Sequence, residues 1–170
     1  MDVRFISSAG LQSCDTGDLP TLLDRTDGLV WVDIPEWNEQ AQHTLASTFQ
    51  FHPLAIRDAA HRNQVPKIHR YHDHVLVVLH APQPGAAGHV HYVELDQFVG
   101  ERFLVTVHRP LNPAVNQAAA MVEVDALLGR LRSGKLKPET AFEPFPRPGA
   151  GVRGAAAHLH RRADQRCLAP

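Results

Sequence analysis

The apolar pattern of this chain changes its period near the middle, and that change most restricts the folds open to it. Across residues 37–49 the larger apolar side chains recur every four residues, which predicts a helix with one apolar face. After the turn-forming residues 63–66 the apolar positions alternate across residues 68–80, which predicts a strand. Its two faces would carry Tyr71, Val75, Val77 and Leu79 on one side and His74, Leu76, Val78 and His80 on the other. A chain with both periods is expected to pack helices against a sheet.

Local composition predicts the remaining elements. Runs rich in β-branched and aromatic residues indicate strands at residues 3–6, 29–34, 89–99 and 103–108. Helices are expected at residues 19–23 (capped by Asp18), at 53–60 (opened by Pro53) and from Asn112 and Pro113 to about Arg132. The inner face of the last helix would carry Val115, Ala119, Val122, Ala126 and Leu131. The loop at residues 82–88 makes the flanking strands an antiparallel hairpin, so the expected fold is an α-β-α sandwich with a mixed, largely antiparallel sheet.

Charge and cysteine content argue against several classes of protein. A net charge of -1 over 170 residues gives no strong attraction to nucleic acid or anionic lipid. Cys14 and Cys167 lie near opposite ends of the chain, which offers no disulfide framework and fits a reducing cytoplasm. The longest aliphatic run, residues 75–79, is far shorter than the ~20 residues that span a bilayer, so no membrane insertion of this chain is expected.

Motifs typical of enzymes are missing from the sequence. There is no Gly-x-Ser-x-Gly and no glycine-rich loop ending in Gly-Lys-Ser or Gly-Lys-Thr. Asp33, after the strand residue Trp31, is expected to be a cap or a surface acid at a strand end. We therefore expect a protein that is not an enzyme.

Several segments, taken in order, carry a family resemblance. They are Trp31-Val32-Asp33-Ile34, Phe51-His52-Pro53-Leu54, Asp58, Pro66-Lys67 and Phe103-Leu104-Val105-Thr106-Val107-His108. Over about residues 1–140 the chain resembles the N-terminal cytosolic domain of the CorA-type magnesium and cobalt transporters. In that family a stalk helix and two membrane-spanning helices follow this domain, and a Gly-Met-Asn motif marks the pore. Neither is found in this sequence.

The resemblance implies a role in cation transport for a chain that itself lacks the pore. The chain would be a soluble cytosolic domain that senses divalent cations or regulates a transporter, and it would not transport ions alone. Its implied partners are divalent cations and other subunits, either copies of itself or full-length transporter chains. The implied location is the cytoplasm, at the inner or plasma membrane where the family resides.

The resemblance also implies a metal ligand at Asp58. In the family, an acid at this position helps form a divalent-cation site between neighbouring subunits, together with a second acid on the stalk helix. Arg57 stands here where many relatives carry another acid, and it would repel a nearby cation. One carboxylate holds magnesium weakly, so weak binding of magnesium or cobalt is expected. The alternative is that Asp58 is a solvated helix residue.

A second metal hypothesis rests on the histidines. Residues 69–74 read His-Arg-Tyr-His-Asp-His, and on a continuous strand His72 and His74 share one face. His89 and His91 could join them across the hairpin if the register allowed, giving a zinc or cobalt site in a stand-alone metal-binding protein. The other interpretation is that all four are exposed histidines at strand ends.

The last thirty residues differ in composition from the rest. Residues 141–170 contain seven Ala, three Gly, four Pro and five Arg, with no helical or strand period. Such a composition predicts a disordered tail after a domain of residues 1–140. A shift of the reading frame near Phe142 is an alternative origin, and it would make the chain a nonfunctional truncated relative.

Overall fold

A mixed sheet is the centre of the structure, a computed structural model that describes residues 1–84, 88–110 and 117–133. Within these residues the sheet has seven strands: β1 (Asp2–Ser7), β2 (Gly10–Cys14), β3 (Gly28–Ile34), β4 (Lys67–Arg70), β5 (Val75–Pro84), β6 (Val90–Val99) and β7 (Phe103–Pro110). The helices are α1 (Leu19–Leu23), α2 (Glu39–His43), α3 (Pro53–Ala60) and α4 (Gln117–Arg132), with a 3₁₀ turn at Thr16–Asp18 and a π-helical turn at Thr44–Thr48.

The strand order is β2-β1-β3-β7-β6-β5-β4. β3 and β7 run parallel, and every other neighbouring pair is antiparallel. The prediction of a mixed, largely antiparallel sheet is therefore confirmed. The parallel pair joins β1–β3 to the later strands. Of the elements between Ile34 and Phe103, the strands β4, β5 and β6 lie beyond β7 in the sheet.

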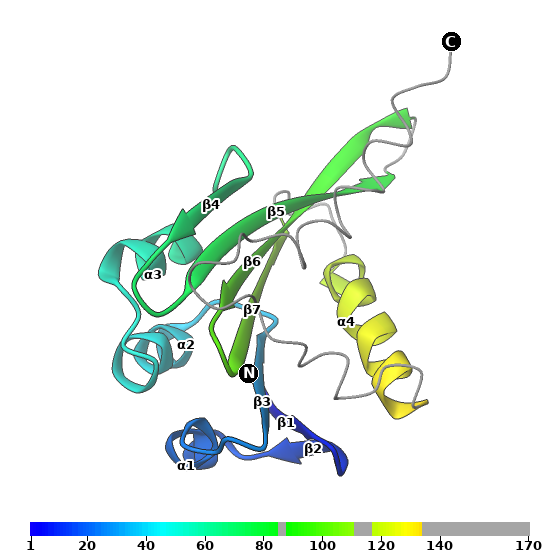
Figure 1. Cartoon of the computed structure of the whole chain (residues 1–170). Helices are drawn as coiled ribbons and strands as arrows, with labels where there is room; N and C mark the ends of the chain where they lie inside the picture. The colour runs from blue at the N-terminus through cyan, green and yellow to red at the C-terminus, as the bar shows by residue number, and fades with distance from the viewer. Residues whose placement is uncertain (85–87, 111–116, 134–170) are drawn as a thin grey trace.

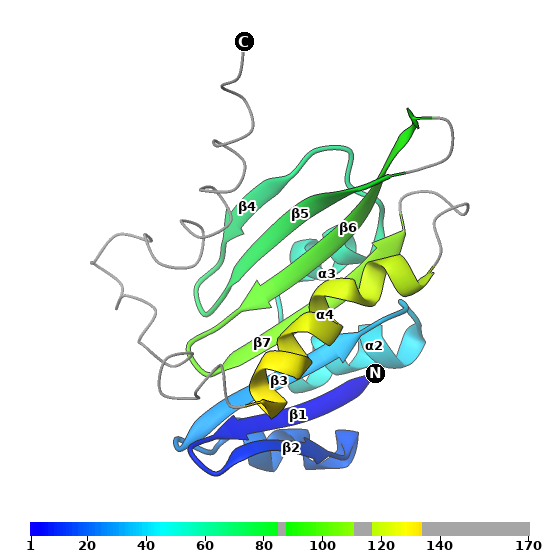
Figure 2. The same ribbon diagram turned by 90° about the vertical axis from the view of Figure 1, so that its right-hand side faces the viewer.

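Helices cover both faces of this sheet, as expected for an α-β-α sandwich. Figure 1 shows α1, α2 and α3 on one face and α4 on the other. The larger core lies under α1–α3, where Ala41, Leu45 and Phe49 of the predicted apolar stripe are 0%, 0% and 7% exposed. In Figure 2, α4 crosses in front of β7, β3 and β1, and no described helix lies in front of β4 and β5.

The inner face of α4 differs from the prediction. Val122 is 54% exposed and Ala126 is exposed, whereas Val124 and Leu128 are buried against Ile6 and Trp31. The helix carries aliphatic residues on two sides, so the spacing alone did not decide which side faces the sheet. Val115 and the side chain of Ala119 lie outside the described residues, as do Asn112, Pro113 and the tail at 141–170.

The strand predicted to run on from Ile68 is in fact two strands. β4 and β5 form an antiparallel hairpin, closed where the Tyr71 N–H donates to the His74 carbonyl at 2.9 Å. The turn contains neither Gly nor Pro, and Asp73 alone did not distinguish it from a continuous strand. β2 was also missed, because its short edge segment has little apolar pattern. Asp18 lies at the predicted cap position, but its carboxylate accepts from the Asp15 N–H instead of from the helix.

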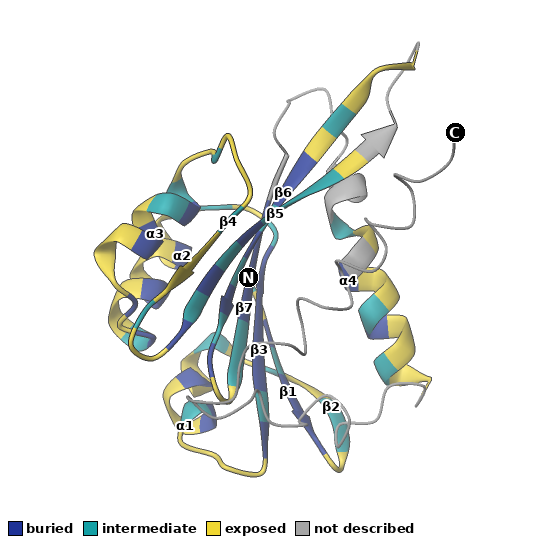
Figure 3. Ribbon diagram, turned by 45° about the horizontal axis from the view of Figure 1, so that its top comes forward, coloured by how far each residue is buried: buried dark blue, intermediate teal, exposed yellow. Residues whose placement is uncertain are grey.

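Burial follows the centre of the sheet, as Figure 3 shows, and falls away toward the distal end of the β5–β6 hairpin. Val90 and Tyr92 near that end are 55% and 48% exposed. None of the helices within residues 1–84, 88–110 and 117–133 has the length and apolar character needed to cross a bilayer.

Candidate cation-binding site at the edge of the sheet

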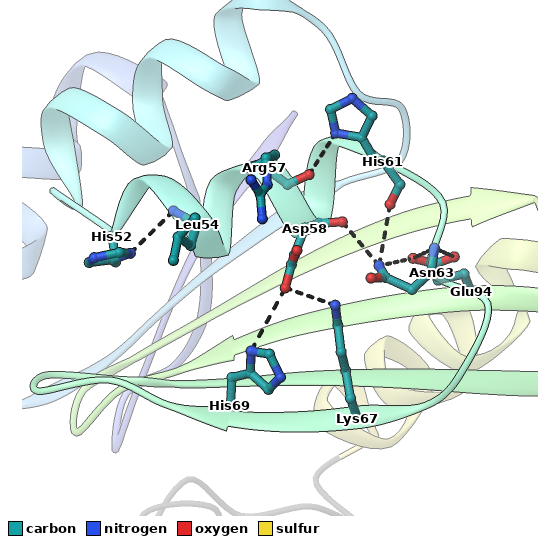
Figure 4. A network of polar contacts seen from close by, with 9 residues as sticks. All are labelled: His52, Leu54, Arg57, Asp58, His61, Asn63, Lys67, His69 and Glu94. Atoms are coloured by element: carbon teal, nitrogen blue, oxygen red, sulfur yellow. Dashed lines mark hydrogen bonds and ion pairs between the residues drawn. The ribbon is translucent and has the colours of Figure 1, made fainter.

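Helix α3 holds Asp58 over the edge strand β4. The helix begins where predicted: the His52 side chain accepts from the Leu54 N–H at 3.2 Å, and Pro53 occupies the first turn, where no backbone donor is needed. Ala55, Ile56 and Ala59 form its buried face and fix its rotation on the sheet. Asp58 therefore lies at the border of that face and points toward β4 (Figure 4).

The Asp58 carboxylate is paired with a lysine. Its Oδ2 lies 2.8 Å from Lys67 Nζ and 3.8 Å from His69 Nδ1, and both partners belong to β4. They reach the same oxygen because alternate residues of a strand share a face. The Asp58 side chain is 17% exposed. Asp58 is therefore a partly buried, ion-paired helix residue.

A buried glutamate fastens the end of α3 to the sheet. Glu94 of β6 is 0% exposed and accepts from the Asn63 N–H at 3.0 and 3.2 Å and from Asn63 Nδ2 at 2.6 Å. The same amide donates to the Asp58 carbonyl at 3.0 Å (Figure 4). This anchor holds the backbone of Asp58 in place. This anchor was not predicted; a glutamate within an apolar strand is costly to bury unless it is hydrogen-bonded, as Glu94 is here.

Tyr71, directly after β4, lies next to the start of α3. Its ring stacks on His52 with centroids 5.3 Å apart and on His74 at 4.8 Å. Burial, and then the nearby Asp58 carboxylate, raises the pKa of the Tyr71 hydroxyl above its ordinary value. The negative charge of Asp58 therefore affects Tyr71 as well as its ion-pair partner Lys67.

These residues do not by themselves make a complete magnesium site. Magnesium needs near-octahedral oxygen coordination, usually with one or two carboxylates and several waters. Here there is one carboxylate, and an ammonium already holds its Oδ2. No group of three or more potential ligands is present in the part of the chain that the structure describes. A cation at Asp58 would need ligands from outside this set.

The four histidines of the second hypothesis do not meet. His74 precedes β5, while His91 lies opposite Gln83 near the other end of the β5–β6 ladder. At about 3.3 Å per residue this places the two pairs roughly 25–30 Å apart. His74 is also not an exposed strand-end residue: it is 3% exposed and packs against Phe51 and Phe98, with Nδ1 2.7 Å from Asp73 Oδ1. His72 and His89 are exposed, as predicted.

A buried polar cluster on the α4 face was not predicted. Asp33 is 0% exposed, so the expectation of a surface acid is wrong. Its Oδ1 accepts from the Thr106 hydroxyl and lies 2.7 Å from Nε2 of buried His108. Trp31 Nε1 donates to Thr106 Oγ1 at 3.1 Å. The cluster joins the parallel strands β3 and β7, and its side chains are buried.

Comparisons with known proteins place this fold and sequence in one family. The family model described as CorA-like Mg2+ transporter protein matches residues 26–143. The proposed metal ion transporter YfjQ of Bacillus subtilis (strain 168) is 38% identical over 87 residues, which is 50% of this chain and 26% of YfjQ.

Solved structures share the fold at low sequence identity. Full-length CmaX aligns with a TM-score of 0.60 and 18% identity, covering 79% of this chain and 39% of CmaX. The complete CorA magnesium transporter from Methanocaldococcus jannaschii aligns with a TM-score of 0.54 and 15% identity, covering 79% of this chain and 37% of that one. The soluble domain of the same CorA gives a TM-score of 0.50 and 15% identity, with 79% and 47% covered.

The chain spans between 26% and 47% of the length of these relatives. The predicted resemblance is confirmed by the family match. Because that match covers residues 26–143, well over half of the 170 residues, the chain belongs to the CorA-like Mg2+ transporter protein family.

Proposed function

We propose that this chain forms the cytosolic, cation-responsive domain of a CorA-type magnesium or cobalt transport assembly. It contacts neighbouring subunits and does not transport ions by itself. The observation that carries the proposal is the position of Asp58. Both of its ion pairs use Oδ2, and no described residue forms a hydrogen bond with Oδ1 of this partly exposed side chain. In this proposal Oδ1 is the atom that contacts a cation or its bound water.

A cation at this oxygen would link subunits because one chain supplies too few ligands. Magnesium keeps several waters and accepts one or two carboxylates, so a second subunit could provide the missing acid. Binding would then stabilise the assembly more than the isolated domain. This division of ligands agrees with the incomplete site in the single chain.

Cation-dependent association is the first test. Sedimentation of the chain in about 10 mM magnesium should show larger species than in EDTA at matched ionic strength, because millimolar concentrations are needed to fill a site with few ligands. Asp58→Asn keeps the shape of the side chain but removes its charge, and it should abolish the difference. Calorimetry on dilute monomer should detect only weak binding in either protein. A tight magnesium site in the monomer, or association that Asp58→Asn leaves unchanged, would contradict the proposal.

Transport by the chain alone is the second test. Expression in a cell deficient in magnesium uptake should not restore growth at low magnesium, because no described helix can span the bilayer. Uptake of cobalt by the same cells should equal that of the empty vector. Uptake that depends on this chain in the absence of any other transporter subunit would refute the proposed role.

A further inference from the structure

We propose that Lys67 is a tethered counter-cation that competes with the divalent cation for the Asp58 carboxylate. The inference rests on the proposed function and adds a residue that sets the cation concentration at which the site responds. In the cation-free chain the ammonium holds the carboxylate. When a divalent cation binds, the ammonium is displaced toward solvent.

In the structure, the Asp58 carboxylate already binds one cation, the ammonium group of Lys67. Lys67 Nζ lies 2.8 Å from Asp58 Oδ2, the distance of a charge-assisted hydrogen bond. The Lys67 backbone is fixed opposite Val78 in the β4–β5 ladder, and the Glu94–Asn63 anchor fixes the backbone of Asp58. Because both backbones are fixed, the Lys67 ammonium stays near the Asp58 carboxylate at a high local concentration.

The side chain of Lys67 can nevertheless leave. It is 28% exposed, and β4 is the edge strand of the sheet, so its four-carbon stem can swing the ammonium into water. Lysine offers a single point charge, whereas arginine would hold a carboxylate with two parallel hydrogen bonds. A lysine therefore competes with an incoming cation but can be displaced by it.

Competition follows because both cations need the same carboxylate. A divalent ion on Oδ1 would lie only a few ångströms from the ammonium on Oδ2, and the two positive charges would repel. The pair and the bound cation thus weaken each other by the same factor, as linkage requires. Removing the ammonium must then strengthen cation binding at Asp58.

The test compares three substitutions in the full chain. Lys67→Met keeps most of the stem and removes the charge, Lys67→Arg strengthens the pair, and Arg70→Met removes one positive charge from β4 without touching Asp58. Arg70 lies opposite Val75 and makes the net charge change of the control equal to that of Lys67→Met. The readout is the magnesium or cobalt concentration at half-maximal association, measured by sedimentation at constant ionic strength. Circular dichroism melts verify that each variant folds.

Lys67→Met is expected to lower this midpoint by about threefold to fivefold, which corresponds to a partly exposed ion pair of about 0.6 to 1 kcal/mol. Lys67→Arg should raise it, and Arg70→Met should leave it within about twofold because exposed charges are screened. Asp58→Asn combined with Lys67→Met should show no response. Equal midpoints for wild type, Lys67→Met and Lys67→Arg, with the response still lost in Asp58→Asn, would overturn the role of Lys67 and leave the cation site standing. No response in wild type or in Lys67→Met would overturn both.

Discussion

Replacing Asp33 with alanine is expected to lower the free energy of unfolding by about 2 to 6 kcal/mol, because two buried partners, Thr106 and His108, each lose a hydrogen bond worth about 1 to 3 kcal/mol when left unmade. Asp33 and His108 are 0% and 2% exposed, so water cannot take the place of the lost carboxylate. Thr106 loses its acceptor as well. Because Thr106 also accepts from Trp31, the loss extends through the cluster that joins β3 to β7.

Urea unfolding followed by circular dichroism measures this effect as a shift in midpoint. Asp27→Ala is the matched control, because Asp27 forms an exposed pair with Arg25 at 2.6 Å and its loss should change the midpoint little. Arg25 holds the pKa of the Asp27 carboxyl below its usual range, yet solvent screens the pair. Equal midpoints for Asp33→Ala and Asp27→Ala would show that the buried cluster does not stabilise the sheet.

Replacing Phe51 with alanine is the second large effect, with an expected loss of about 3 to 5 kcal/mol. Phe51 is 3% exposed and connects α3 to the sheet through rings on several elements. Its ring lies against Phe49, His74, Phe98 and Phe103, with centroids 5.1, 4.4, 4.5 and 5.5 Å away. Alanine would leave a cavity among these rings, and close-packed interiors lose stability when such a volume is emptied.

Thermal unfolding measures this change, with about 2 to 4 °C expected for each kcal/mol in a domain of this size. Phe51→Leu is the control because it keeps most of the apolar volume, and it should cost less than half as much. A melting temperature for Phe51→Ala equal to that of the native chain would mean that the aromatic cluster does not support α3.

The fold was predictable where the pattern was local. The β5–β6 hairpin followed from alternation on both sides of a Pro- and Gly-rich loop, and α3 begins at Pro53 and ends at Ala60 as predicted. The turn at residues 71–74 was not predictable, because His-Arg-Tyr-His-Asp-His contains no residue that forces a turn. The face of α4 that meets the sheet was decided by tertiary packing, since Val122 and Val124 are equally apolar.

The candidate site was predictable only in part. The resemblance pointed to Asp58, but its pairing with Lys67 depends on how α3 crosses the edge strand, which no spacing in the sequence specifies. The burial of Asp33 was invisible for a similar reason: Thr106 and His108 lie 73 and 75 residues away along the chain. An acid in a strand looks like a surface residue until its distant partners are known.

During synthesis, β3 cannot pair with β7 until the residues between them have been made. Trp31 meets Thr106 only after 75 further residues have been made, which takes roughly 4 to 15 seconds at 5–20 residues per second. Until then β3 has β1 as its only neighbouring strand, and the edge that will pair with β7 is open. An open strand edge presents unpaired backbone groups that can pair with another chain. Because β7 lies between β3 and β6, the two parts of the sheet can be joined only after residues 103–110 have left the ribosome.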